Sequence, residues 1–361
     1  MTEPSDGLVV PGLTEPDPPP ARPPLPAVFF SLLALTGSFA VLLQVDLPIL
    51  WFLRSHNLSA FQPLGDMGEK LGNGGTLVAI SVLIMLTGVY LKRQSLTRLG
   101  RDSLLAHGVV ALVVNGLKHL IGRPRPRLTH SGGWQWWPSW DAGLDSFPSG
   151  HTSATVAVVT VLSRAVPQWR WLFFGVAAWV AASRIWRGSH FPSDVISAMV
   201  MGFMVGSIFN RPLRWWGRSC GHAIVAIAPM TLFFTGLFWV PMHRIVDPTT
   251  DGILFASGAV LVAVSVVLRW TASQTSVISG DPARTTTADC LLTLGLGIVT
   301  AAPVLMILTG LVCLARWSRS ATFEGGSVAE QPSKAYASLH ALGAAVLVVA
   351  IQTAKGVVPL Q

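Results

Sequence analysis

Long apolar runs separated by short polar segments dominate the pattern of hydrophobic and polar positions along the chain. Each run approaches the roughly 20 residues that a helix needs to cross the hydrocarbon core of a bilayer. The candidate spans, about ten by this criterion, are residues 28–46, 76–91, 103–121, 151–167, 171–187, 194–210, 220–240, 253–268, 290–314 and 338–358. The pattern predicts an all-α polytopic membrane protein with a six-helix core and about four additional transmembrane helices.

The composition agrees with this prediction, since 51% of the 361 residues are hydrophobic and only 12% are charged. Soluble domains carry about 25% charged residues. The net charge of +8 does not indicate nucleic acid, because most Lys and Arg residues lie in short loops beside the spans. Cys220, Cys290 and Cys313 occur singly, so neither a disulfide framework nor a zinc site is expected.

The distribution of apolar runs divides the chain into three regions. Residues 1–27 are rich in proline and lack the features of a signal peptide, which predicts a disordered cytoplasmic tail. Residues 28–215 contain the first six spans. Residues 216–361 form a transmembrane extension without visible chemistry, whose role is left open among packing, partner binding and shaping a lipid entrance.

The charges of the loops predict how the spans are oriented. The loops assigned to the cytoplasmic side are basic, as the positive-inside rule requires, at residues 91–101, 162–171 and 210–219. The loops assigned to the outer side are residues 47–75, 122–150 and 187–193. The last two are also basic, against the topological preference, which indicates that their charges have a function. On this assignment the N-terminus lies in the cytoplasm and residues 122–150 and 187–193 face the outside, which for a bacterial cytoplasmic membrane is the periplasm.

Chemistry-bearing residues gather at the outer ends of consecutive spans, in the stretches LKHLIGRPRPR (117–127), SFPSGHTS (146–153) and SRIWRGSHFPSD (183–194). Lys118 offers a point charge, and Arg125 and Arg184 offer planar forks that match phosphate oxygens. Ser149 is a candidate N-cap at a helix end that favours anions, and Gly150 allows close approach of the backbone. These residues predict a phosphate-binding cradle.

Two histidines remain for acid–base and nucleophilic work. His190 precedes Asp194 by four residues, so the carboxylate can accept the Nδ1–H of the imidazole and leave Nε2 as a nucleophile. His151 is free to protonate a leaving oxygen. Because the basic cluster can neutralise the transition-state charge, a phosphohistidine route needs no metal and no cofactor.

The motifs Lys118-x6-Arg125-Pro126, Pro148-Ser149-Gly150-His151 and Ser183-Arg184-x5-His190-x3-Asp194 resemble the three-part signature of the type 2 phosphatidic acid phosphatase superfamily, in order and spacing. The resemblance covers residues 28–215. It implies His190 as nucleophile, Asp194 as its partner, His151 as general acid, and Lys118, Arg125, Arg184, Ser149 and Gly150 as phosphate ligands.

The substrate that the resemblance implies is a membrane lipid phosphate or diphosphate, hydrolysed at the outer face. Candidates are undecaprenyl diphosphate, phosphatidylglycerol phosphate, phosphatidic acid and a lipid A phosphate. A lipid phosphotransferase that uses the same phosphohistidine remains an alternative, and so does a non-catalytic lipid-binding scaffold. The only partners expected are the bilayer and this lipid; protein partners are left open.

Other polar residues near the motifs have simpler explanations. Arg123, Arg127 and Arg187 lie outside the signature and are assigned to headgroup or interface contact, with contact with the substrate as the alternative. Asp66 and Glu69 are outward carboxylates that are expected to cap short interfacial helices, with contact with the site as the alternative. His119 and His130 read as satisfied surface histidines, and Asn57 begins a glycosylation pattern that matters only in a eukaryotic chain.

Four tryptophans crowd the second outer loop, namely Trp134, Trp136, Trp137 and Trp140. They suit an aromatic belt at the headgroup level, or a wall for a lipid headgroup.

Overall fold

The chain is seen here in a computed structural model that describes residues 21–56, 61–129, 137–209, 211, 213–242, 248–274, 282–320 and 334–357. Twelve α-helices and no strand occur among these residues, so the all-α prediction is confirmed. By length and composition, four of the helices can cross a membrane, or five when the bent pair α2–α3 counts as one span. The tail at 1–20, Asn57, His130, Trp134 and Trp136 lie outside the described residues.

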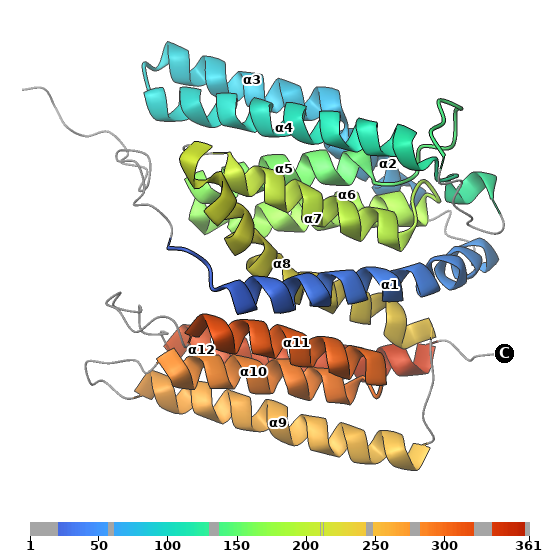
Figure 1. Cartoon of the computed structure of the whole chain (residues 1–361), viewed down its shortest axis with the longest axis vertical. Helices are drawn as coiled ribbons and strands as arrows, with labels where there is room; N and C mark the ends of the chain where they lie inside the picture. The colour runs from blue at the N-terminus through green and yellow to red at the C-terminus, as the bar shows by residue number, and fades with distance from the viewer. Residues whose placement is uncertain are drawn as a thin grey trace, which may run out of the picture. The chain divides into compact units, whose positions relative to one another are not determined.

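The helices group into two compact units, one built mainly from residues 50–223 and the other from residues 22–49 and 224–361 (Figure 1). The long helix α1 (Leu25–Ser55) contributes to both units, as does α8 (Trp216–Met242). The predicted phosphatase region, residues 28–215, therefore differs from the first unit mainly in the first span, because residues 28–49 group with the second unit. Every predicted site residue lies in the first unit.

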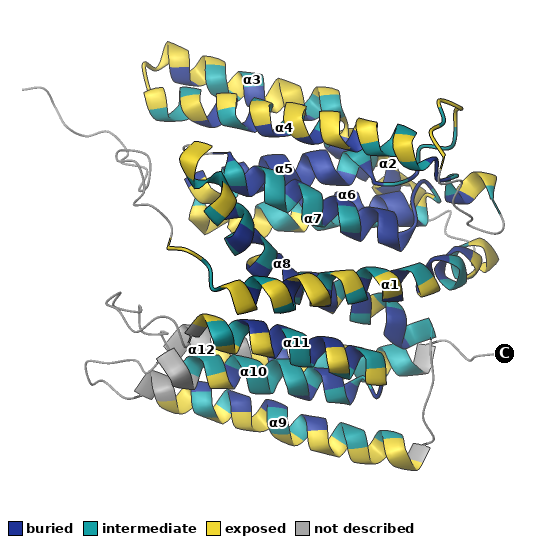
Figure 2. Cartoon of the chain, viewed as in Figure 1, coloured by how far each residue is buried: buried dark blue, intermediate teal, exposed yellow. Residues whose placement is uncertain are grey.

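The first unit is built around α5 (Gly150–Ala165), which packs against α4 (Gln94–Ile121), α6 (Arg170–Trp186) and α7 (Pro192–Ile208). Small and β-branched residues fill α5 and nearly all of them are buried (Figure 2). Gly206 permits the close approach of α7, because a Cβ there would lie 2.5 Å from the carbonyl oxygen of Ala157. The central helix is therefore shielded, and its first turn is held in a fixed place.

Two further helices complete this unit: α2 (Gln62–Gly72), which packs against α6, and α3 (Gly74–Tyr90), which packs against α4. Large apolar side chains of α3 and α4 are exposed, among them Leu83 and Leu112. Exposed positions recur along both helices (Figure 2). Contiguous apolar exposure of this kind is unfavourable in water and suits contact with lipid tails.

The end of α4 matters most for the site. Helix α4 stops at Ile121, and Gly122 follows in the left-handed conformation with φ of 61°. Glycine adopts this conformation without steric penalty, so the chain reverses here. The sequence alone predicts this end, because Gly122 and Pro124 suit a helix that stops just after Lys118. The structure confirms that prediction. Lys118 thus lies in the last turn while the residues after Gly122 return toward the other helices.

The second unit contains parts of α1 and α8 together with α9 (Pro248–Gln274), α10 (Pro282–Val299), α11 (Pro303–Ser320) and α12 (Lys334–Val357). The prediction of one continuous span at 290–314 is wrong, because a turn at residues 300–302 separates two packed helices. Ala301 has a positive φ of 54°. Pro303 then starts α11, where its missing N–H is not needed.

Candidate active site

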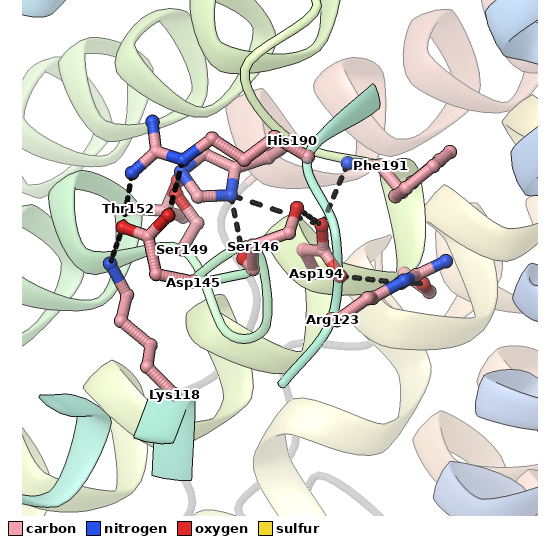
Figure 3. Close-up of polar contacts among 11 residues, drawn as sticks. Lys118, Arg123, Asp145, Ser146, Ser149, Thr152, His190, Phe191 and Asp194 are labelled. Carbon is pink, nitrogen blue, oxygen red and sulfur yellow. Dashed lines mark hydrogen bonds and ion pairs between the residues drawn. The ribbon is translucent and has the colours of Figure 1, made fainter. Parts of the chain in front are cut away.

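Three segments of the first unit meet beside the ends of α4, α5 and α7 (Figure 3). Backbone hydrogen bonds join them: the N–H of Ser146 donates to the carbonyl of Arg123 at 2.9 Å, and the N–H of Ser149 donates to the carbonyl of Asp194 at 3.2 Å. The second bond ties the start of α5 to the start of α7. The structure thus brings the three predicted stretches into one site.

His190 lies in the turn between α6 and α7 and is 2% exposed. Its Nδ1 is 2.7 Å from the carbonyl oxygen of Ser146. Because a carbonyl oxygen can only accept, Nδ1 carries the hydrogen and Nε2 of the neutral ring keeps its lone pair. Burial lowers the pKa of His190, and the nearby carboxylate of Asp194 opposes that effect only in part. The imidazole therefore stays neutral, as a nucleophile requires.

The predicted direct hydrogen bond, in which the Nδ1–H of His190 donates to the carboxylate of Asp194, is not formed. Oδ2 of Asp194 lies 3.8 Å from Nδ1, beyond hydrogen-bond distance. Oδ2 instead accepts from the hydroxyl of Ser146 at 2.6 Å and from the N–H of Phe191 at 2.9 Å (Figure 3). Ser146 therefore connects the two residues, with its hydroxyl on Asp194 and its carbonyl on His190.

Arg123 was expected at the membrane interface, and that prediction is wrong. The side chain is 2% exposed. Its NH1 donates to Oδ1 of Asp194 at 2.5 Å and to Oγ of Ser193 at 2.7 Å, and its guanidinium lies 4.1 Å from the centre of the Phe191 ring. The reversal at Gly122 turns this arginine inward, where it balances a carboxylate that is fully buried.

The predicted cradle residues Lys118 and Arg125 lie together, and a carboxylate joins them. Arg125 donates to both oxygens of Asp145, from Nε at 2.8 Å and from NH2 at 2.5 Å, and Nζ of Lys118 is 3.7 Å from the same carboxylate (Figure 3). The hydrogen bond from Arg125 holds the pKa of Asp145 at about 2. In this structure, the bidentate face of Arg125 thus holds Asp145.

Arg184 and His151 present polar atoms that the protein does not satisfy. Among the described residues, Nε and NH1 of Arg184 and Nε2 of His151 are buried and have no hydrogen-bond partner. The nearest carboxylate to Arg184 is Glu69, whose Oε2 is 3.6 Å from NH1. Buried donors without acceptors are costly, by about 1–3 kcal/mol each. An anion with several oxygens would satisfy them.

Ser149 occupies the N-cap position of α5, as predicted, but its side chain makes no capping bond. Its hydroxyl accepts from Thr152 at 3.1 Å. The N–H groups of the first turn are therefore not capped by this side chain. A Cβ on Gly150 would lie 3.7 Å from Nζ of Lys118, so this glycine lies directly beside the predicted cradle.

Asp66 and Glu69 do not cap helices, contrary to the prediction. Both lie on α2 and pair with Arg187, Asp66 with NH1 and Glu69 with NH2, the latter at 2.7 Å. Arg187 is 31% exposed and is held by these two carboxylates, so it is not the membrane-interface residue that was predicted. The two carboxylates fasten α2 to the end of α6.

The described part of the aromatic loop is fastened to the end of α4. Nδ1 of His119 is 3.1 Å from the carbonyl oxygen of Ser139, and the His119 ring stacks on Trp140 with centroids 4.1 Å apart. His119 is satisfied, as predicted. Trp137 and Trp140 remain exposed.

Sequence reasoning missed Arg123, Asp145 and Ser146. Asp145 carried a usable signal, because a lone carboxylate four residues before Ser149 faces a cluster of cations in the same predicted site. Arg123 carried a weaker one, since it directly follows the glycine that reverses the chain. Ser146 acts through its backbone carbonyl, which no side-chain pattern reveals.

Comparison with known proteins places the chain in a family. The model of the PAP2 superfamily matches residues 100–218. A lipid A 1-phosphatase of Rhizobium etli is 32% identical over 161 residues, which is 41% of this chain and 69% of that protein. The chain belongs to the PAP2 superfamily. The family match includes all eight predicted site residues and also Arg123, Asp145 and Ser146.

Other PAP2 relatives differ in the substrates that their names state. The undecaprenyl-diphosphatase BcrC of Bacillus subtilis is 33% identical over 108 residues, 29% of this chain and 53% of that protein. A decaprenylphosphoryl-5-phosphoribose phosphatase of Mycobacterium tuberculosis is 31% identical over 138 residues, 36% of this chain and 68% of that protein. No solved structure matches.

The family match at residues 100–218 includes none of the second unit, which consists of residues 22–49 and 224–361. Within the described ranges, no group of three or more His, Cys, Asp or Glu residues is placed to hold a metal ion.

Family membership and the apolar helices together identify an integral membrane protein of the phosphatase type.

Proposed function

We propose that this PAP2 protein is a lipid phosphatase that hydrolyses a phosphate or diphosphate on a membrane lipid through a phosphohistidine at His190. The observation that carries the proposal is the set of unsatisfied buried atoms on Arg184 and His151. Arg184, His190 and Lys118 all lie close enough to His151 to influence it electrostatically. A phosphoryl group placed among them would accept hydrogen bonds from the guanidinium and lie within reach of both histidines.

In the first step, the lone pair on Nε2 of His190 attacks phosphorus. The bond from phosphorus to the lipid oxygen breaks, and protonated His151 gives its proton to the departing oxygen. Lys118, Arg125 and Arg184 stabilise the charge on the equatorial oxygens. The products are the lipid alcohol, or the lipid monophosphate from a diphosphate, and phosphorylated His190.

In the second step, water attacks the phosphorus of phosphohistidine. Neutral His151 accepts a proton from this water, the P–N bond breaks, and its electron pair returns to Nε2 of His190. Inorganic phosphate leaves. Throughout both steps the Nδ1–H of His190 donates to the carbonyl of Ser146, which keeps Nε2 directed at phosphorus.

The substrate class follows from the surroundings and from the relatives. The exposed apolar faces of α3 and α4 suit a lipid environment, and relatives are named for lipid A, undecaprenyl diphosphate and decaprenylphosphoryl phosphoribose. The basic segments 91–101 and 162–171 contain the turns between α3 and α4 and between α5 and α6, which lie at the end of the first unit away from the site (Figure 1). We therefore propose, on the positive-inside rule, that the site faces outward and the N-terminus lies in the cytoplasm, in a bacterial cytoplasmic membrane.

The test is to trap the intermediate. Purified protein is mixed with a lipid phosphate that carries labelled phosphorus and is quenched in alkali, where phosphohistidine survives. We expect label on the wild type and on His119→Ala, a nearby histidine outside the reaction, and no label or turnover with His190→Ala. Full turnover by folded His190→Ala would overturn the mechanism. A chelator is expected to leave activity unchanged; activity that needs an added divalent ion would refute metal independence.

The same assay separates hydrolysis from transfer to a second lipid. A hydrolase releases inorganic phosphate from a single lipid substrate in detergent. Release that requires an added acceptor lipid would identify a phosphotransferase with the same covalent intermediate.

A further inference from the structure

The least expected feature of the site is a buried ion pair outside the three-part signature. Arg123 and Asp194 have exposed fractions of 2% and 0%, and NH1 of Arg123 lies 2.5 Å from Oδ1 of Asp194. Arg123 is also fixed by Ser193 and by the ring of Phe191. These contacts hold Arg123 on residues at the start of α7, whereas Arg125 holds Asp145 beside Lys118.

A chain of contacts leads from Arg123 to the nucleophile. Arg123 holds one oxygen of Asp194, and the other oxygen accepts from the hydroxyl of Ser146 at 2.6 Å. The carbonyl of Ser146 then lies 2.7 Å from Nδ1 of His190. The backbone reinforces this chain, because the N–H of Ser146 donates to the carbonyl of Arg123 at 2.9 Å. Arg123 therefore contacts Ser146 through its main chain and, by way of Asp194, through its side chain.

We propose that Arg123 is a positioning residue for the nucleophile: it fixes Asp194 so that Asp194 and Ser146 together present the Ser146 carbonyl to Nδ1 of His190. The inference rests on the proposed function, since it assumes that His190 reacts. In this proposal Asp194 orients His190 through Ser146 and not by a direct hydrogen bond. Arg123 touches neither the substrate nor the reacting atoms.

The charge on Arg123 matters because the carboxylate of Asp194 is fully buried. A buried carboxylate without a positive partner tends to take up a proton or to rotate toward another donor. Either change would release the hydroxyl of Ser146 and let its carbonyl move away from His190. A displacement of about 1 Å at a reacting group can reduce the rate on the order of 100-fold.

The experiment is a double-mutant cycle on the purified full-length protein, with Arg123→Met, Asp194→Asn and the double variant. Methionine keeps much of the apolar stem and removes the charge. We expect Arg123→Met to lower kcat about 100-fold in the wild-type background and less than about threefold in the Asp194→Asn background, because residues that act in one chain are not additive. Equal loss of kcat in both backgrounds would overturn the proposal.

A second readout separates positioning from phosphate binding. Inorganic phosphate serves as a competitive inhibitor, and its inhibition constant reports the cradle. Arg123→Met is expected to leave that constant unchanged, whereas Arg125→Met should weaken it. A large weakening with Arg123→Met would show that Arg123 is a phosphate ligand and would refute the inference.

Controls address folding and the underlying mechanism. Arg127→Met removes an exposed arginine from the same segment and should behave as wild type. If Arg123→Met does not fold, Arg123→Lys and Ser146→Ala test the same chain of contacts, with Arg123→Lys expected to retain more activity than Ser146→Ala; full activity of both would refute the inference. An active His190→Ala would refute the proposed function, whereas an inactive His190→Ala beside a fully active Arg123→Met would refute only the role of Arg123.

Discussion

Replacing Asp145 by asparagine should make the site bind phosphate more tightly. In the structure Asp145 holds both donors of the Arg125 fork and lies 3.7 Å from Nζ of Lys118. An incoming phosphate needs the same donors. Asparagine keeps the size of the side chain and one acceptor oxygen, but it removes the charge and the second acceptor that compete with the ligand for Arg125.

The size of the effect follows from the pKa of Asp145, which falls from 3.8 to about 2, chiefly through the hydrogen bond from Arg125. At 1.36 kcal/mol for each pKa unit, this corresponds to ~2.4 kcal/mol in favour of the ionised carboxylate. The side chain is 32% exposed. Solvent screening reduces the value to ~1–1.5 kcal/mol, which is a factor of about ten in affinity.

The assay is inhibition of turnover by inorganic phosphate at low ionic strength. We expect the inhibition constant to fall about tenfold in Asp145→Asn, and less as salt is added. A lowered pKa keeps the carboxylate charged above its ordinary value of 3.8, so the difference should be constant between about pH 5 and pH 8.

The matched control is Asp141→Asn, which removes the same charge from an exposed position in the same loop and should change the constant less than about twofold. An unchanged or weaker inhibition constant in Asp145→Asn would refute competition. Asp145 would then serve to orient Arg125 and Lys118.

Two further predictions concern acidity and packing. Burial lowers the pKa of His190, so its neutral form persists as the pH falls below the ordinary value of 6.5; with an aryl phosphate, the acid limb of kcat/KM should therefore lie below pH 6.5, and a limb at or above that value would contradict the burial argument. In the second unit, a Cβ on Gly258 would lie 2.6 Å from the carbonyl oxygen of Gly295. Gly258→Val should lower the stability of the detergent-solubilised protein by about 1–3 kcal/mol, measured as a lower Tm, whereas Gly252→Val, which meets nothing within 4 Å, should not.

The sequence was sufficient to predict the helices, which follow from apolar runs, and the position where α4 ends. Apolar runs predicted the helices, and Gly122 with the prolines after it predicted where α4 ends. Alternating spans then predicted that Lys118, His151 and His190 lie at one site, because the ends of consecutive spans alternate between faces. The geometry of the site agrees with that expectation, while the catalytic roles remain predictions.

What the sequence did not reveal depends on contacts between distant segments. The partners of Arg123 are 70 and 71 residues away, so no local pattern distinguishes this buried arginine from its neighbour Arg125. The acceptor for Nδ1 of His190 is a backbone carbonyl, which every residue possesses. The break between α10 and α11 was missed because Ala301 and Ala302 are apolar and continue the hydrophobic run, although Pro303 marks the start of a new helix.

The Arg123–Asp194 pair also constrains how this site can change during evolution. Removal of either member alone leaves an uncompensated charge in the interior, at a penalty of about 3–5 kcal/mol. That is a large share of the 5–15 kcal/mol by which a typical protein is stable. The two positions should therefore covary: a relative that lacks the arginine must supply another cation or donor to the aspartate, or must neutralise the aspartate as well. Such relatives would be natural counterparts of the double variant.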